Sequence, residues 1–275
     1  MLEITRHDHV TRLRMFTWRS RLAGLDVSAY VLRGVMIDTG FPHAWPDLGR
    51  ALPELRLRGA IVTHAHEDHA GNAPYLASLA VPLHLAPLTE RTLRARPEIL
   101  PYRRIIWGRP PALDAAVIPL EPQPLEFVPT PGHSEDHHIV WDAETETVFS
   151  GDLWLGVRSR AMHHHEDPRR IIESLERVAA LRPKHLFDAH RGEVETPLEA
   201  IRAKITWMKD TIGAIERRIA EGWSDRAILN AVLGGEERAG YVSAGEYARM
   251  NFVRAVRHHG EVGAVEGRSR DATLI

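Results

Sequence analysis

The stretch THAHEDHAG at residues 63–71 stands at the end of a short apolar run, AIVT at residues 60–63. It places four polar side chains, His64, His66, Asp68 and His69, within six positions. Loops at strand ends collect metal-binding and catalytic groups, because the strand fixes the base of the loop while its side chains stay accessible. Imidazoles together with a carboxylate suit zinc, iron or manganese. The stretch therefore predicts a buried strand, a metal-binding loop and a helix over about residues 71–79.

Three further potential ligands follow predicted strands in the same way. His133 lies in TPGHS after a strand expected at residues 125–128, and Asp152 lies in FSGD after residues 148–149. His190 lies in DAHRG after residues 185–189. Each stands near a glycine or another small residue that lets the backbone turn tightly. Any one of them alone is weak, but the ordered set favours a metal site over four unrelated surface loops.

The composition limits both the class of protein and the kind of metal site. The chain has 275 residues, of which 44% are hydrophobic and 26% charged, with a formal net charge of −2. This balance is typical of globular proteins and argues against a protein that mainly coats nucleic acid or an anionic membrane. With no cysteine, any metal must be held by histidine, aspartate or glutamate. The charged N-terminus lacks the apolar core of a signal peptide and no apolar stretch is long enough to span a bilayer, so we expect a soluble cytoplasmic protein.

Short strands alternate with helices in the first 200 residues, and several strands are joined by tight turns, as at Arg33–Gly34. This order predicts an α/β fold with a mixed sheet or sandwich. Asp167 before Pro168 predicts a helix start. We expect a metal-binding domain over residues 1–200 and a helical subdomain over residues 201–275.

Three helix starts are predicted in the C-terminal segment. Thr196 with Glu199 and Ser243 with Glu246 have capping-box spacing, and Ser224 is expected to cap a shorter helix that ends at Gly234. The helix that opens at Ser243 is expected to run to about residue 258.

The ordered motifs resemble those of the metallo-β-lactamase superfamily of hydrolases over roughly residues 25–192. The resemblance implies a four-layered αββα sandwich with metals at one edge, between the sheets. It implies His64, His66 and His133 as ligands of a first metal. Asp68, His69 and His190 are implied as ligands of a second metal, with Asp152 bridging the two. Asp38, in the early VMIDTG, would orient a ligand.

Within the superfamily, GHSEDH at residues 132–137 and SGDLWLG at residues 150–156 resemble the β-lactamase-like-protein-2 branch. That branch carries a helical, winged-helix-like tail and includes RNA-cleaving members. His137 would orient the His133 loop. The chain departs from the branch at DAHRG, where many relatives have PGHG, and no wing is evident in its tail.

The resemblance implies a hydrolase with two divalent metal ions and a metal-bridging hydroxide, in which Asp68 is the catalytic residue. Zinc is the expected metal, with iron or manganese as alternatives. The leading interpretation is hydrolysis of a small ester, thioester or lactone. A single-stranded RNA endonuclease is the alternative, and an iron-dependent sulfur dioxygenase is a minor one. The near-neutral charge favours a small-molecule substrate over RNA, and a homodimer through the C-terminal helices is a further expectation.

Two segments have two interpretations each. The arginine-rich residues 91–109, with Tyr102 and Trp107, fit either a solvated helix followed by a proline-rich loop or an anion-binding lid. His163, His164 and His165 with Glu166 fit either a solvated loop or a substrate contact and proton shuttle. We prefer the solvated interpretation for both.

Overall fold

The computed structural model describes residues 1–96, 98–159 and 161–258, and two facing sheets form its centre. The first sheet has the strand order β1-β2-β3-β4-β5-β6, antiparallel through β4 and parallel from β4 to β6. Its strands are β1 (Leu2–His7), β2 (Val10–Met15), β3 (Val27–Leu32), β4 (Val35–Ile37), β5 (Gly59–Ile61) and β6 (Leu83–His84).

The second sheet has the order β12-β11-β9-β8-β7, in which only the β9–β11 pair is parallel. Its strands are β7 (Glu126–Pro129), β8 (His138–Asp142), β9 (Thr147–Phe149), β11 (His185–Asp188) and β12 (Gly192–Glu193). This mixture of parallel and antiparallel pairs agrees with the mixed sheet or sandwich expected from the short, closely spaced strands.

The alternation of side chains along β3 explains why both faces of the first sheet are buried. Tyr30 and Leu32 point into a core shared with the second sheet, where the Tyr30 ring lies 5.4 Å from that of Phe149. Val27 and Ala29, at the intervening positions, point to the opposite face. A strand buried on both sides reads as a continuous apolar run, as VSAYVL does here.

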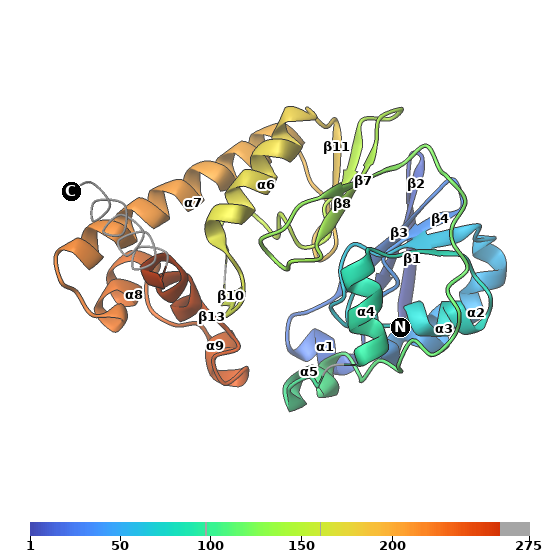
Figure 1. Cartoon of the computed structure of the whole chain (residues 1–275), viewed down its shortest axis with the longest axis horizontal. Helices are drawn as coiled ribbons and strands as arrows, with labels where there is room; N and C mark the ends of the chain where they lie inside the picture. Colours follow the sequence, from blue (N-terminus) through green and yellow to red (C-terminus); the bar gives the residue numbers. More distant parts are fainter. Residues whose placement is uncertain (97, 160, 259–275) are drawn as a thin grey trace, which may run out of the picture.

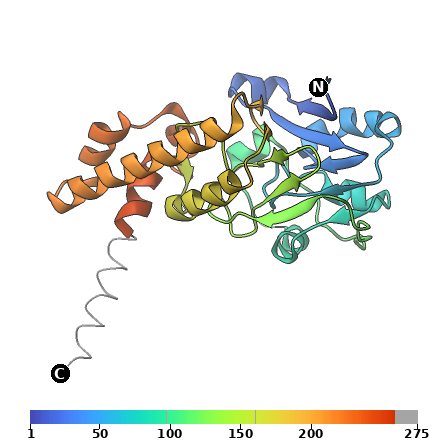
Figure 2. The ribbon, with the colours of Figure 1, turned by 90° about the horizontal axis from the view of Figure 1, so that it is seen from above.

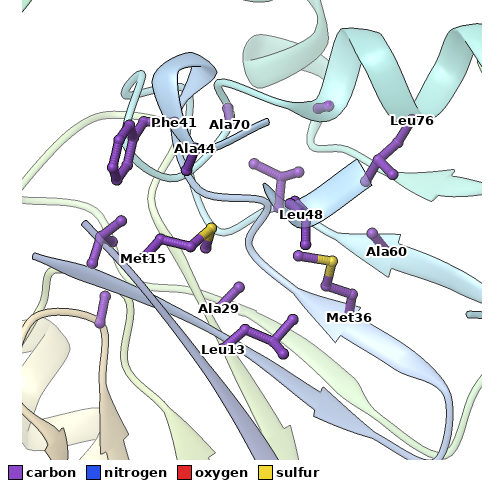
Figure 3. Close-up of a cluster of buried hydrophobic side chains, with 14 of the residues drawn as sticks. Leu13, Met15, Ala29, Met36, Phe41, Ala44, Leu48, Ala60, Ala70 and Leu76 are labelled. Atoms are coloured by element: carbon purple, nitrogen blue, oxygen red, sulfur yellow. The ribbon is translucent and has the colours of Figure 1, made fainter. Parts of the chain in front are cut away.

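Helices cover both outer faces, which gives four layers in the order helix, sheet, sheet, helix (Figure 1). Leu48 of α2 (Trp45–Leu55) and Leu76 of α3 (Ala73–Ser78) pack with Met36 and Ala60 on the first sheet (Figure 3). α6 (Pro168–Ala180) and α7 (Pro197–Ala220) pack on the second sheet through a separate core. The expected αββα sandwich is confirmed. Its remaining helices in this part are α1 (Trp18–Leu22), η1 (Pro42–Ala44), α4 (Pro87–Ala95) and α5 (Pro101–Ile106).

The C-terminal segment is helical, as expected, and projects from the sandwich (Figures 1 and 2). It comprises the outer part of α7, then α8 (Asp225–Leu233), α9 (Arg238–Val242) and a further helical stretch over residues 249–258. A two-stranded sheet joins β10 (Met162–His163) to β13 (Tyr247–Ala248) and so ties this segment back to the sandwich. The expected boundary at residue 200 falls in the first turn of α7, and residues 259–275 lie outside the described residues.

Two of the predicted helix starts are confirmed with their caps, the start at Thr196 is confirmed without its expected capping box, and the start at Ser243 is wrong. Asp167 caps α6 and Ser224 caps α8 through their side chains. Thr196 has φ +45° and makes no capping hydrogen bond, so the capping box expected there is absent. Ser243 instead ends α9, and the next helical residues come only after β13. The side chain of Glu236, distant in sequence, accepts from the backbone of residues 249 and 250 and caps that helix. No helix in the described part of the chain is long and apolar enough to cross a bilayer.

Candidate metal centre

The carboxyl ends of β4, β5, β7, β9 and β11 lie along one edge of the sandwich. The seven predicted ligands lie in the loops that follow four of these strands, namely β5, β7, β9 and β11. The structure brings them into two groups whose potential ligand atoms lie within 4.8 Å of one another. The first group is His64, His66, His133 and Asp152, and the second is Asp68, His69 and His190. Segments more than 120 residues apart in the sequence thus converge on one site, as the strand-end positions predict.

Three imidazoles converge in the first group. His64 Nε2 and His133 Nε2 each lie 3.0 Å from His66 Nδ1. The hydroxyl of Thr63 donates to Asp38 and therefore accepts from His64 Nδ1, at 3.0 Å, which leaves His64 Nε2 facing the cluster. Burial, followed by neighbouring imidazoles, holds the pKa of His64 well below its usual range. Neutral imidazole is the form that binds a metal ion.

The second group is also oriented by contacts behind its rings. His190 Nε2 lies 3.5 Å and His69 Nε2 3.9 Å from Asp68 Oδ2. The opposite nitrogen of His69 donates to Asp38 Oδ2 at 2.8 Å, and that of His190 donates to the carbonyl of Asp26 at 2.6 Å. Such hydrogen bonds fix the tautomer and the direction of a ligating ring. Asp38 therefore has the orienting position that the sequence suggested for it.

Asp152 lies between the two groups, with one carboxylate oxygen toward each. Its Oδ1 is 3.1 Å from His69 Nε2 and 3.3 Å from His190 Nε2, whereas its Oδ2 is 3.5 Å from His133 Nε2. This placement is what a carboxylate that bridges two cations requires.

Unsatisfied polar atoms test whether the residues fit a cation. His69 Nε2 and Asp152 Oδ1 are buried and face each other, yet neither has a hydrogen-bond partner within the described part of the chain. Buried polar atoms without partners are costly. Five imidazoles and two carboxylates form a donor set that suits divalent zinc, iron or manganese. The residues therefore fit a metal at both groups.

The charges of the site favour a cation as well. Burial lowers the pKa of His190, but Asp152 and Asp68 outweigh it and raise the pKa to about 9. For His69, the carboxylates of Asp152, Asp38 and Asp68 similarly overcome burial and hold the pKa well above its usual value. The carboxylates thus favour protonated imidazoles, and a divalent ion that bound there would displace these protons.

Several residues that the sequence analysis did not single out hold this centre in place. The carboxylate of Asp136 accepts from the backbone N–H of Ala65, between two predicted ligands, at 2.9 Å and from the Thr89 hydroxyl at 2.7 Å. Asp188 accepts from the backbone of His190 and Leu155. Their only signal in the sequence was proximity to a ligand motif, because the contacts of Asp136 with Ala65 and Thr89, and of Asp188 with Leu155, join segments distant in the chain.

His137 joins the His133 loop to the Asp152 loop. Its Nδ1 bonds the hydroxyl of Thr130, three residues before His133, which agrees with the expected contact with that loop. Its Nε2 also accepts from the backbone N–H of Asp152 at 3.1 Å, which the sequence did not predict. Gly151 has φ +48°, and a Cβ there would stand 2.8 Å from the His137 ring. Only glycine allows this close approach.

A cavity of about 340 Å³ opens beside the two groups and is lined by residues of both the sandwich and the C-terminal segment. His163 lines it, half-buried, with its ring 5.4 Å from that of His66 and 5.0 Å from that of Tyr247. His164 and His165 are exposed. Glu166 is buried and lies 3.2 Å from His133 Nδ1, without hydrogen-bond alignment. The solvated interpretation therefore suits only part of this histidine cluster.

The arginine-rich segment is occupied with contacts inside the protein. Arg94 pairs with Glu90, and Arg104 and Arg109 both pair with Glu98. These contacts agree with the interpretation as a helix followed by a loop and leave less charge free for an anion-binding lid. Arg103 forms a bidentate ion pair with the buried carboxylate of Glu67, through two hydrogen bonds of 2.5 Å each.

Comparison with known proteins gives a consistent result. A family profile described as the metallo-beta-lactamase superfamily matches residues 22–190. A beta-lactamase-like protein 2 homolog of Drosophila melanogaster is 26% identical over 205 residues, 66% of each chain. An atrochrysone carboxyl ACP thioesterase of Aspergillus fumigatus is 27% identical over 175 residues, 62% of this chain and 51% of the relative. The chain thus spans about half to two thirds of the length of these curated relatives.

Solved structures show the same fold at low identity. A metallo-beta-lactamase family protein from Thermus thermophilus has a TM-score of 0.59 at 20% identity, covering 86% of this chain and 89% of its own. The DIM-1 metallo-beta-lactamase has a TM-score of 0.58 at 14% identity, over 76% of this chain and 97% of its own.

Proposed function

Because the chain belongs to the metallo-beta-lactamase superfamily, we propose that it is a metal-dependent hydrolase that cleaves a small thioester, with esters and lactones as related substrates. The position of Asp152, with one oxygen toward each ligand group, carries the proposal. It favours two divalent ions, for which zinc is our first expectation, and a hydrolytic centre of the two-metal type.

The proposed ligands are those of the two groups: each histidine and Asp68 would present one atom, and Asp152 would present one oxygen toward each group. His64 Nε2, His66 Nδ1 and His133 Nε2 would bind the first ion, and Asp68, His69 and His190 the second. Ions held there would supply Lewis acidity and lower the pKa of a water molecule from its high value in bulk water toward about 7. The chain itself would hold a substrate carbonyl in the cavity and limit the access of other water.

Asp68 is the proposed catalytic residue. It is buried, and its Oδ2 faces both His69 and His190 across 3.9 and 3.5 Å. A carboxylate at this place can orient the attacking water and accept its proton at Oδ2. His163 lies on the cavity wall nearest His66 and would contact the substrate.

A thioester is preferred because a relative with 27% identity is named as an acyl carrier protein thioesterase and because the cavity is of a size that suits small molecules. RNA cleavage remains the alternative, but several arginines that would favour it are paired with glutamates. The iron-dependent dioxygenase would need a single iron, which metal analysis can distinguish from two zinc ions.

The test is hydrolysis by the zinc-loaded protein of acyl thioesters, lactones, simple esters and single-stranded RNA. Asp68→Ala measures contaminating activity, and Asp114→Ala, which changes an exposed aspartate, serves as the matched control. Turnover of thioesters that Asp68→Ala abolishes and Asp114→Ala keeps would support the proposal. Cleavage of RNA alone, or thioester turnover that survives Asp68→Ala, would refute it.

A further inference from the structure

Lys204 is a buried lysine on α7, in the helical layer that covers the second sheet, and it lines the same cavity. Only 2% of the residue is exposed, and it lines the cavity beside the metal centre. Its Nζ donates to the carbonyl of Gly156 at 3.2 Å and to the hydroxyl of Ser159 at 3.3 Å. An ammonium has three N–H donors, so one remains for another partner.

The charge of Lys204 has no carboxylate partner. Among residues 1–96, 98–159 and 161–258, no carboxylate lies within 4.0 Å of its Nζ, and both atoms that it contacts are neutral. Burial lowers its pKa to about 8, although the more distant Glu166 and Asp188 oppose the change. Buried charges in proteins are normally paired or bound to an ion. An uncompensated ammonium at a cavity wall therefore points to an anion that comes from outside the chain.

Arg191 places a second cation at this part of the cavity. It follows the predicted ligand His190 directly and lines the same cavity. Its Nε donates to the carbonyl of Leu155 at 3.1 Å, which holds the side chain against the loop that also contacts Lys204. This contact uses the inner nitrogen and leaves the two terminal groups of the guanidinium, whose planar arrangement matches a carboxylate.

A third cation on the cavity wall shows the contrast. The Arg103 guanidinium forms a bidentate ion pair with Glu67 and a further ion pair of 3.3 Å with Glu246. Its charge is therefore neutralised within the protein. Lys204 and Arg191 differ in that, within the described part of the chain, their side chains donate to carbonyl and hydroxyl oxygens.

We infer that Lys204 and Arg191 form a subsite for a carboxylate carried by the substrate. The inference rests on the proposed hydrolytic function and narrows its substrate class to thioesters or esters with an anionic end. The scissile carbonyl would lie toward Asp152 and the carboxylate toward α7. Because α7 belongs largely to the C-terminal segment, that segment would determine which acyl groups the centre accepts.

The test measures binding separately from turnover. Two series of thioether analogues, which lack the scissile carbonyl, end in a carboxylate or in a methyl group. In each series the end group is placed two, three and four carbons from the sulfur. Titration calorimetry measures their affinity for the zinc-loaded protein and for Lys204→Met, Lys204→Gln and Lys209→Met. Lys209 is an exposed lysine on the same helix, paired with Glu176, and serves as the matched control.

We expect the protein to bind at least one carboxylate analogue about 10-fold to 100-fold more tightly than the methyl analogue, as a charged hydrogen bond allows. Both substitutions of Lys204 should remove this preference without weakening the methyl analogue, while Lys209→Met should keep it. Equal affinities, no binding of either analogue, or a preference that survives Lys204→Met would each overturn the subsite, the last because the metals would then hold the carboxylate.

Hydrolysis of the corresponding succinyl and butyryl thioesters separates the two proposals. If neither thioester is cleaved but the binding preference depends on Lys204, the proposed function fails and the subsite stands. If both are cleaved at equal kcat/KM and the analogues bind equally, the function stands and the subsite fails.

Discussion

Replacing Lys204 with methionine is expected to stabilise the folded protein at neutral pH, although it should impair substrate selection. A lysine whose pKa falls from its usual 10.5 to about 8 is kept as a cation at pH 7 at a cost of about 3 kcal/mol, since each pKa unit is worth about 1.4 kcal/mol. Methionine fills a similar volume without a charge. It loses the hydrogen bonds to Gly156 and Ser159, worth about 1 kcal/mol each, so the net gain should be about 1 to 2 kcal/mol.

The pH dependence of this gain follows from the direction of the pKa change. The folded state of the unsubstituted protein holds the Lys204 proton more weakly than the unfolded state does. The cost is therefore complete below pH 8, and it disappears as the pH rises from about 8 toward 10.5. At pH 10 the cost of keeping Lys204 charged should be about 1 kcal/mol. The free energy of unfolding of the unsubstituted protein, relative to that of Lys204→Met, should therefore be about 2 kcal/mol higher at pH 10 than at pH 7.

Urea denaturation at pH 7 and pH 10 measures both effects, with Lys209→Met as the control for removing a lysine from α7. A free energy of unfolding that rises in Lys204→Met at pH 7 and loses this advantage at pH 10 agrees with a charge held at a cost. If Lys204→Met is less stable by the same amount at both pH values, Lys204 is a structural anchor of the loop around Ser159, and the reasoning from its burial is wrong.

Three other substitutions test different parts of the site. Asp152→Ala should reduce the bound metal from about two ions to one or fewer per chain, measured by elemental analysis; unchanged metal content would exclude a bridging role. Asp38→Asn keeps the shape of the side chain but weakens its hold on His69, so metal affinity should fall by about 10-fold to 100-fold; competition with a chelator measures this, and an unchanged affinity would count against it. Tyr102→Phe removes a hydrogen bond of 2.5 Å to Glu246 and should lower the free energy of unfolding by about 1 kcal/mol, measured in urea; no loss would mean that the bond is not formed in solution.

The potential ligands could be predicted from the sequence because each lies in a loop that follows a short strand. The strand sets the position of the residue that follows it, so local pattern and final place coincide at His64, Asp152 and His190. Lys204 and Asp136 gave no such signal. Lys204 sits in a regular helical repeat and reaches the cavity because α7 packs on the second sheet, and Asp136 meets Ala65 across 71 residues of sequence.

The helix starts show the same limit. Ser224 caps α8 as its sequence predicts, because the cap and the helix are adjacent. The spacing of Ser243 and Glu246 predicted a cap equally well, yet tertiary contacts prevailed. Glu246 bonds Tyr102 and Arg103 of α5, and Glu236 supplies the cap from a preceding loop.

Glu246 also explains how the C-terminal segment is connected to the metal centre. Glu67 stands between the predicted ligands His66 and Asp68, and its buried carboxylate binds Arg103. Arg103 in turn contacts Glu246, next to β13. The ligand loop is thereby joined to the C-terminal segment by a chain of charged contacts on one side of the cavity, while α7 carries Lys204 to the cavity wall. Removing one partner of a buried ion pair strongly destabilises a protein, so we expect Arg103 to hold the ligand loop and the C-terminal segment together. The proposed recognition of an anionic substrate is then left to Lys204, which has no carboxylate partner in the described part of the chain.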